Sequence, residues 1–264
     1  MIILQTLWQL WLVLIPTGIA AGIVSSATGL ASLVSYPILL AIGLPPVVAN
    51  VTNTYSLFFA ELGATISSKK ELHGHQHDLK VILPLTLIGC VIGSLILFMI
   101  PASTFEKVVP FFILLAALVV LWPQNYRRKP TIPVGQPATR QQNLIKIATW
   151  AGIFLVGVYS GYFGAASGVL MLSLLAVISP LTFAEYNAEK NVTLGLANLI
   201  SAIIYATQTT IQWHYIIPLA IGFLVGGFIG PVLVRRIPER VIKVVIGIGS
   251  LILAATLFIQ AYRK

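Results

Sequence analysis

The chain consists mainly of long apolar segments separated by short polar stretches, and this pattern constrains its fold more than any other feature. Of its 264 residues, 58% are hydrophobic and only 9% are charged, whereas soluble domains carry about 25% charged residues. So few charges cannot cover a surface that faces water. The apolar runs are continuous and of helical length, unlike the short alternating stretches of a transmembrane β-barrel. The sequence therefore predicts an all-α integral membrane protein.

We count ten apolar segments and expect each of them to form a helix. Their approximate ranges are 5–24, 29–44, 46–67, 80–99, 107–122, 146–161, 164–179, 183–206, 214–234 and 241–260. No basic region precedes the first segment, so we expect a retained helix and not a cleaved signal. The single cysteine, Cys90, excludes an internal disulfide framework.

The basic residues fall mainly in loops on one side of the membrane if the N-terminus is placed outside. Of the 16 basic residues, the inner loops then hold all but Lys107, Arg263 and Lys264, namely Lys69, Lys70, Lys80, Arg127, Arg128, Lys129, Arg140, Lys146, Lys190, Arg235, Arg236, Arg240 and Lys243. Lys and Arg collect on cytoplasmic loops. We therefore expect a multi-pass plasma-membrane protein with both termini outside. The net charge of +9 then requires no nucleic-acid partner.

The second half of the chain repeats features of the first. Residues recur at offsets of 139 and 137 along the chain: Gly18, Gly22, Gly29, Ala49 and Thr54 match Gly157, Gly161, Gly168, Ala188 and Thr193, and His77, Gly89, Gly93 and Pro101 match His214, Gly226, Gly230 and Pro238. Each half holds five segments, an odd number, so the halves must face opposite ways. We predict a first transmembrane repeat at 1–123, a cytoplasmic linker at 124–145 and a second, inverted repeat at 146–264. Such inverted repeats are typical of transporters that hold their substrate near the midplane.

Two short segments at corresponding positions of the halves are interrupted by glycine and small hydroxyl residues. The first tract reads GIVSSATG and the second GYFGAASG. Their segments are about 16 residues long, whereas a full span needs about 20, which predicts broken or re-entrant helices. The N-terminus of a half-helix presents N–H groups that attract anions. The alternative is that small residues let helices pack closely and that the hydroxyls bond back to their own helix.

These tracts, followed by YPILLAIGLPPVVANVTNT, resemble the TauE/SafE sulfite-exporter family. The residues that carry the resemblance are Gly22, Gly29, Pro37, Gly43, Pro46, Ala49, Thr54, Gly161, Gly168, Ala188 and Thr193. It covers nearly the whole chain in length, segment order and motif. The resemblance implies a plasma-membrane transporter of small sulfur-containing anions such as sulfite, sulfoacetate or other organosulfonates.

The third and eighth segments place polar residues near the middle of the membrane. At 1.5 Å per residue, Thr54 lies about 12 Å and Thr193 about 15 Å into a core of roughly 30 Å. The predicted substrate-binding residues share these depths or the two tracts: Ser25, Ser26, Thr28, Gly29, Asn53, Thr54, Ser167, Gly168, Lys190, Asn191 and Thr193. Lys190 is a basic residue that reaches this depth and is a candidate anion ligand. Its alternative role is a shallower lysine that pairs with Glu189 or Glu185 and extends to the cytoplasmic face.

Other polar residues receive less specific interpretations. Glu61 could carry a proton, but we favour a position facing water at the inner end of its segment. His73, His75 and His77 occupy a charged loop, which we interpret as solvated; we expect neither a metal nor a cofactor. GFLVGGFIG and GCVIG are interpreted as helix-packing faces, and these glycine-rich faces leave homodimerisation open.

The favoured function is a membrane transporter, not an enzyme, that binds a small anion within the lipid bilayer and exposes it alternately to each side. Export is the favoured direction, because a negative-inside potential expels anions unaided. One alternative is ion-coupled uptake of the same anions. Another is an intramembrane serine hydrolase built on Ser160 or Ser167 with His214 as a distant base, although the spacing of a serine elbow is absent.

Overall fold

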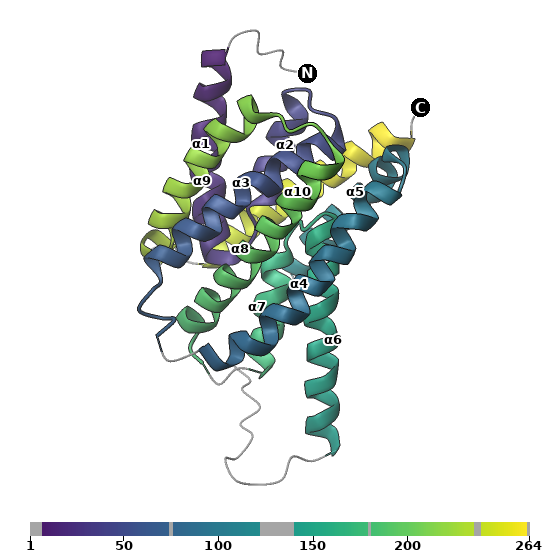
Figure 1. Ribbon diagram of the computed structural model, residues 1–264. Helices are drawn as coiled ribbons and strands as arrows, with labels where there is room; N and C mark the ends of the chain where they lie inside the picture. Colours follow the sequence, from purple (N-terminus) through teal and green to yellow (C-terminus); the bar gives the residue numbers. More distant parts are fainter. Residues whose placement is uncertain (1–6, 74–75, 122–139, 179–180, 235–238, 263–264) are drawn as a thin grey trace.

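The computed structural model describes residues 7–73, 76–121, 140–178, 181–234 and 239–262. Within these ranges the chain forms ten α-helices and no strand (Figure 1). The helices are α1 (Leu7–Thr28), α2 (Ser32–Ala41), α3 (Pro46–Ser67), α4 (Gln76–Met99), α5 (Ala102–Leu121), α6 (Arg140–Tyr162), α7 (Ser167–Ile178), α8 (Phe183–Gln208), α9 (Trp213–Val234) and α10 (Glu239–Tyr262). The predicted all-α architecture of ten segments is thus confirmed for the described residues.

The predicted linker at 124–145 falls mostly outside the described residues. Its last six residues, 140–145, are helical, because α6 begins at Arg140 and not at the predicted residue 146.

Local signals in the sequence fix where the two central helices begin. Pro46 opens α3 as its first helical residue, a position where the missing N–H of proline costs nothing. Thr182 precedes α8 and forms a capping box with Glu185, whose carboxylate accepts bonds from the Thr182 N–H at 2.7 Å and hydroxyl at 2.8 Å. These starts place the polar stretches of α3 and α8 at a defined depth along each helix.

Two helix breaks occur at the two glycine-rich tracts. Helix α1 ends at Thr28, and Gly29 follows with φ of 72°, a conformation that disfavours any residue with a Cβ atom. Helix α6 ends at Tyr162, and Gly164 has φ of 71°. In both places the chain continues as a short helix, α2 or α7. The predicted interruption of these segments is therefore observed.

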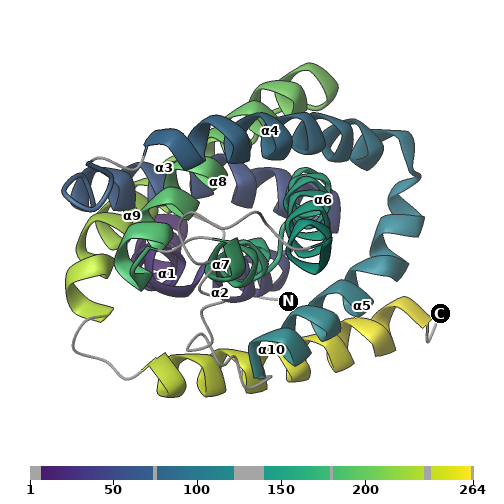
Figure 2. The same cartoon turned by 90° about the horizontal axis from the view of Figure 1, so that it is seen from below.

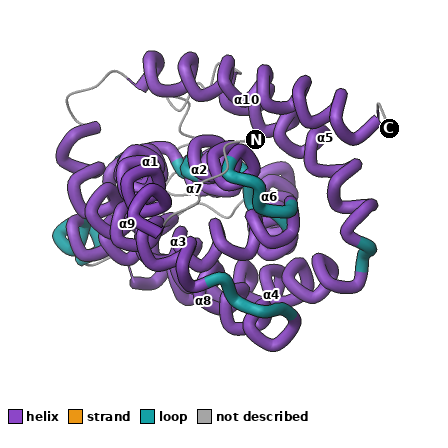
Figure 3. Tube along the Cα trace, turned by 90° about the horizontal axis from the view of Figure 1, so that it is seen from above, coloured by secondary structure: helices purple, strands orange, loops and turns teal. Residues whose placement is uncertain are grey.

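The broken helices occupy the middle of the molecule. Viewed along the bundle, α1, α2, α7 and α6 form a central row (Figures 2 and 3). Helices α5 and α10 lie side by side along one flank, and α9, α3, α8 and α4 cover the other. The two breaks are thus enclosed by the remaining helices.

Glycines allow the helices of the central row to approach their neighbours closely. Helix α1 packs against α9 and α6 against α4. A Cβ atom on Gly22 of α1 would lie 2.7 Å from the carbonyl oxygen of Phe223, and one on Gly161 of α6 would overlap that of Cys90. Glycines of GFLVGGFIG and GCVIG, among them Gly226 and Gly93, make equally close backbone contacts, so these stretches are helix-packing faces as predicted.

The outer surface is apolar, as a lipid-facing surface must be. Helices α1, α4, α6 and α9 each contain a stretch long and apolar enough to cross a membrane. Large apolar side chains remain exposed on several helices, for example Leu95 on α4, Leu155 on α6 and Phe228 on α9. The structure is therefore that of a membrane-embedded helical protein.

Candidate functional site

The two helix breaks meet in the centre of the molecule. A Cβ atom on Gly29 would overlap the Cα atom of Gly168, and one on Gly168 would overlap the Cα atom of Gly29. These two predicted site residues therefore touch through their backbones and leave no space for a side chain. The junction joins the end of α1 to the start of α7.

Helices α3 and α8 contact each other and carry a row of buried polar side chains. On α3 these are Asn50, Thr52, Asn53, Thr54, Ser56 and Glu61, and on α8 they are Asn187, Glu189, Lys190, Asn191, Thr193, Asn198 and Ser201. Buried polar groups in a membrane need partners or mark a functional site.

Ser25, in the last turn of α1, lies between two opposite charges. Its hydroxyl donates to Oε1 of Glu61 at 2.8 Å. Its carbonyl oxygen accepts a bond from Nζ of Lys190 at 2.9 Å. Glu61 is 2% exposed and Lys190 is fully buried, and the two charges interact electrostatically. The ammonium group thus occupies the C-terminal end of a helix, where a cation is favourable.

Two asparagines bind the ends of the broken helices across the two halves. Asn187 of α8 donates to the carbonyl oxygen of Ser26 at 2.8 Å, and Asn50 of α3 donates to that of Tyr162 at 3.2 Å. Each asparagine satisfies a carbonyl in the last turn of a helix from the other half, where intrahelical partners are lacking. Both interruptions are thus held by the helices that line the centre.

Several buried polar atoms on α3 and α8 have no hydrogen-bond partner within the described residues. They are both amide atoms of Asn191, the hydroxyls of Thr52 and Thr193, the amide oxygens of Asn50 and Asn187, and Oε2 of Glu61. In folded proteins almost all buried polar atoms are paired. Buried polar side chains that lack partners in the described part of the chain are suited to bind a polar ligand.

Other predicted site residues use their polar groups within their own half. The hydroxyls of Ser26 and Thr28 bond back to α1, to the carbonyl oxygens of Ile23 and Val24, both at 2.9 Å. This is the back-bonding that the sequence left open as an alternative. Asn53 accepts a bond from Ser35 and donates to Ser32 at 3.0 Å.

The remaining predicted residues, Thr54 and Ser167, are buried on α3 and at the start of α7. The N–H group of Ser167 bonds to the carbonyl oxygen of Gly164 at 3.0 Å. Backbone donors of the first turn of α2 are likewise engaged, since the N–H groups of Val34 and Ser35 bond to Ala31 at 2.9 and 3.0 Å. These three N–H groups are therefore not available to an anion, whereas the side chains of α3 and α8 offer further donors.

Three polar residues near the breaks were missed by sequence reasoning. Glu61 does not face water at a helix end, as favoured from the sequence; it is buried against α1, and only its intramembrane charge hinted at this. Asn50 and Asn187 flank the predicted residues, but their partners lie 112 and 161 residues away. Lys190 does not extend to the protein surface, because its side chain is fully buried and its ammonium group bonds to Ser25.

The groups invoked for a hydrolase or a metal site are arranged differently. Ser160 is buried in α6, whereas His214 is exposed at the start of α9, with its ring 4.1 Å from that of Tyr215. In the described part of the chain, no group of three or more His, Cys, Asp or Glu residues could hold a metal. His73 is exposed, and His75 lies outside the described residues.

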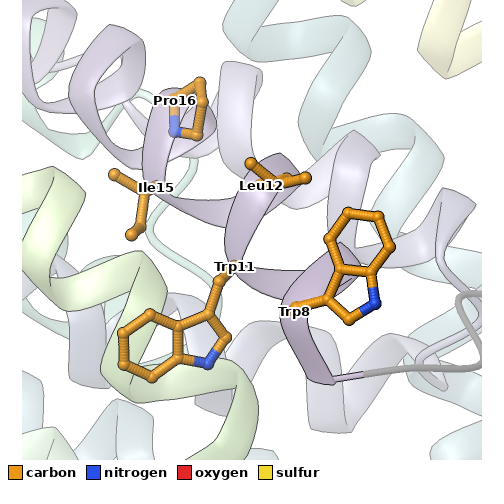
Figure 4. A pocket seen from close by; sticks show the side chains of 5 residues that line it. All are labelled: Trp8, Trp11, Leu12, Ile15 and Pro16. Atoms are coloured by element: carbon orange, nitrogen blue, oxygen red, sulfur yellow. The ribbon is translucent and has the colours of Figure 1, made fainter.

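A separate pocket lies along the N-terminal half of α1 (Figure 4). It measures about 660 Å³ and is lined by Trp8, Trp11, Leu12, Ile15 and Pro16. Trp8 and Trp11 are exposed, as is usual for tryptophans at a membrane interface. The pocket belongs to the lipid-facing surface and not to the polar centre.

Comparison with known proteins assigns the family. A model of the family described as Sulfite exporter TauE/SafE matches residues 14–257. The chain belongs to the TauE/SafE family. A relative of this family member in Haemophilus influenzae, named "Probable membrane transporter protein", is 24% identical over 244 residues, which is 92% of each chain. "Probable membrane transporter protein YfcA" of Escherichia coli K12 is 23% identical and covers 92% of this chain and 87% of its own.

A third relative of the TauE/SafE member, "Probable membrane transporter protein ORF9" of a Sinorhizobium species, is 23% identical over 90% of this chain and 88% of its own. No solved structure matches the chain. The chain is therefore a membrane transporter of this family, as its sequence predicted, and the relatives' names specify neither substrate nor direction.

Proposed function

We propose that this protein transports small sulfur-containing anions, such as sulfite, sulfoacetate or other organosulfonates, by alternating access at the junction of its two halves. The observation that carries the proposal is the meeting of the two helix breaks at Gly29 and Gly168, beside the buried ammonium group of Lys190. Interrupted helices at the junction of two halves are the usual substrate site of such transporters. The family name supports sulfite as the anion class.

The binding site in this proposal comprises the predicted residues and three that the contacts add. Lys190 supplies positive charge, and Asn191 and Thr193 supply amide and hydroxyl groups that have no partner in the described structure. Asn50, Asn187 and Glu61 join them. Ser25 positions the charged pair, Ser26 and Thr28 bond to the backbone of α1, and Asn53 bonds to the hydroxyls of Ser32 and Ser35.

The two halves form inverted repeats in this proposal. The contacts support it, because exchanging the halves exchanges the packing pairs: α1 with α9 becomes α6 with α4, and α3 with α9 becomes α8 with α4. Helix α5 packs against its counterpart α10, and α3 against its counterpart α8, so each of these pairs is exchanged with itself. Helix α1 runs downward from the upper end of the molecule in Figure 1, and α6 runs upward from the lower end. The two halves would then rock against each other around the fixed site.

The proposed topology places both ends of the chain outside the cell and the linker in the cytoplasm. The start of α1 and the end of α10 lie toward the same end of the molecule, opposite the start of α6 (Figure 1). The distribution of Lys and Arg over the loops sets the orientation.

The direction of transport depends on whether a cation travels with the anion. An anion that moves alone is expelled by a negative-inside potential, with about 2.3 kcal/mol per charge for each 100 mV. This gives the export that the sequence favours. A monoanion that moves with one monovalent cation has no net charge, so the potential exerts no net force on the pair. The buried carboxylate of Glu61 is a candidate carrier for such a cation.

Counterflow in proteoliposomes tests the proposal. Liposomes loaded with unlabelled sulfite, sulfoacetate, taurine or methanesulfonate receive the same compound in labelled form outside. We expect saturable, transient accumulation of at least one of these compounds. Protein-free liposomes and liposomes containing Gly168→Trp protein, which cannot close the junction, serve as controls. Absence of counterflow for all four compounds would contradict the proposed function.

A further inference from the structure

Glu61 and Lys190 form a buried pair of opposite charges at the end of α1. They reach Ser25 from α3 and α8, one at its hydroxyl and one at its carbonyl oxygen. Gly195 of α8 has no side chain and so lets α8 lie close to Glu61. A Cβ atom at Gly195 would lie 3.0 Å from the Cβ atom of Glu61. A single uncompensated charge at this depth is strongly disfavoured, whereas the pair carries no net charge.

We propose that the transported anion enters this site together with one proton, which binds Glu61. The inference rests on the proposed function. Before binding, the carboxylate of Glu61 and the ammonium group of Lys190 balance each other. A monoanion that entered alone would leave one net negative charge buried. The proton comes from a hydronium ion of the outer solution, so one O–H bond breaks there, leaving water, and one forms on the carboxylate; Lys190 then balances the anion and the site stays neutral.

The atoms needed for this exchange are in place. Within the part of the chain that the structure describes, Oε2 of Glu61 has no hydrogen-bond partner, while Oε1 is held by Ser25. The proton therefore has an oxygen available without loss of the existing bond. The Lys190 ammonium group has three donors, and one of them serves Ser25. The neighbouring Asn191 adds an amide without a described partner.

The other titratable groups around α3 lie elsewhere or have partners. Glu189 precedes Lys190 on α8 and has an interaction of its own. Tyr36 of α2 meets the opposite, N-terminal end of α3, where its hydroxyl donates to the carbonyl oxygen of Pro46 at 3.5 Å, and Glu106 of α5 interacts with that tyrosine electrostatically. The α1 and α9 segments that face Glu61, 22–28 and 221–231, contain no ionisable side chain.

Coupled entry makes transport of a monoanion electroneutral. The membrane potential then neither expels nor attracts the loaded carrier. A proton gradient that is acid outside drives net uptake, with an accumulation of up to about tenfold per pH unit at one proton per anion. The charged pair therefore favours the uptake alternative over potential-driven export.

The test uses methanesulfonate and sulfite in proteoliposomes of the full chain, with counterflow measured first. Methanesulfonate keeps a single negative charge across the pH range, so any proton that moves with it is carried by the protein. We then apply a one-unit pH gradient at zero potential and, separately, a potential at equal pH. We expect accumulation with the pH gradient, alkalinisation outside and little response to the potential.

The Glu61→Gln variant should change the driving force of transport. Lys190 then has no counter-charge until the anion binds, so the rate of counterflow should change, and the response to the pH gradient, measured relative to counterflow, should fall to that of protein-free liposomes. Transport should instead follow the potential. Glu106→Gln, which replaces an exposed carboxyl on α5, should behave like the unaltered protein.

Each outcome separates the two proposals. Absence of counterflow in the unaltered protein contradicts the proposed function itself. Counterflow accompanied by potential-driven current and no proton movement overturns the coupling while the transporter stands; this measurement requires no variant to fold. If Glu189→Gln abolishes the response to the pH gradient and Glu61→Gln does not, the assignment of the proton to Glu61 is overturned.

Discussion

The two helix breaks have similar backbones but different surroundings. The end of α1 is held by charged groups, Glu61 at the Ser25 hydroxyl and Lys190 at its carbonyl oxygen. The end of α6 is held by neutral groups. Tyr205 donates to the carbonyl oxygen of Gly161 at 2.6 Å, and Tyr159 donates to that of Ala165 at 2.7 Å.

Aromatic packing adds to this difference. Phe163, in the second break, has its ring 5.2 Å from that of Tyr36 and 5.7 Å from that of Phe105. Its counterpart region in the first break, residues 29–31, has only Gly, Leu and Ala. Aromatic contacts of this kind give large, directional packing energy. The second break is thus a packed anchor, and the first is the place where a change of charge can act.

The largest expected effect comes from removing the charge at the first break. Lys190→Ala leaves Glu61 buried without its counter-charge, which should destabilise the protein by about 3–5 kcal/mol. Counterflow should fall by at least about a hundredfold, since 1.4 kcal/mol corresponds to a factor of ten. Thermal stability in detergent and counterflow measure the two effects.

Two variants separate loss of charge from loss of fold. Lys146→Ala removes an exposed lysine on α6 and should change neither quantity measurably. Lys190→Ala combined with Glu61→Gln should recover stability relative to Lys190→Ala alone, because no unpaired charge remains. If the double variant is no more stable than Lys190→Ala, the two charges do not balance each other.

Replacing either glycine of the contact between the two breaks, Gly29 or Gly168, should give the next largest loss of stability. An alanine at 29 would overlap the backbone of Gly168, at a cost of about 1–3 kcal/mol for overpacking, and its left-handed conformation adds about 1–2 kcal/mol. Gly168→Ala should show the overpacking cost alone, because Gly168 is not among the residues with positive φ. Thermal stability of both variants tests this difference.

Gly152→Ala is the matched control for the junction. Its Cβ atom would meet the side chain of Leu174 at 3.0 Å, and a leucine side chain can shift where a backbone cannot. We expect a change below about 1 kcal/mol. Equal destabilisation by Gly152→Ala and Gly168→Ala would show that the contact between the two breaks is not special.

Much of the fold could be predicted from hydropathy and local signals. Helix α3 spans Pro46–Ser67, the range predicted, because prolines mark its start. Helices α4 and α6 begin earlier than predicted, at Gln76 and Arg140. Their first turns are polar, and hydropathy does not detect a helix that extends beyond the apolar core.

The site was less accessible to sequence reasoning, because its contacts join distant parts of the chain. Lys190 could be singled out as a charge within an apolar segment. Its partner Ser25 lies 165 residues away and Glu61 reaches the same serine from a third helix. Glu61 was assigned to the surface because its depth was judged along its own helix. The sequence does not show that the end of α1 packs beside it.

A smaller effect is expected from the unpaired polar atoms of α8. Asn191→Ala should raise the apparent KM for the transported anion about tenfold, the value of one hydrogen bond to a charged group. Thr193→Val removes a buried hydroxyl without a described partner and should leave stability unchanged or slightly higher. Concentration dependence of uptake and thermal stability measure these effects.

Asn53→Ala should lower stability and leave transport affinity unchanged, the reverse of what we expect for Asn191→Ala. The variant therefore tests whether the anion binds on α8. The Asn53 amide bonds to Ser32 and Ser35, so its removal takes away the donor to the buried Ser32 hydroxyl, while Ser35 keeps its bond to Ala31; the cost should be about 1–3 kcal/mol of stability. The apparent KM should change little. A large rise in KM for Asn53→Ala together with none for Asn191→Ala would place the anion on α3 instead of α8.

The smallest effect is expected at the second break, and it tests the comparison directly. Tyr205→Phe removes the hydroxyl that donates to Gly161 and also interacts with Ser201, Thr54 and Ser94, and it keeps the ring, which packs 5.4 Å from that of Phe98. The bond to Gly161 should account for about 0.5–1.5 kcal/mol of stability. Transport should fall less than about threefold, since no charge is exposed or unpaired by the change.

Tyr159→Phe should behave alike, because its hydroxyl also bonds one carbonyl of the break. If either variant abolishes counterflow as Lys190→Ala does, while remaining folded in detergent, then the second break moves during transport and is not the packed anchor that its neutral, aromatic surroundings indicate.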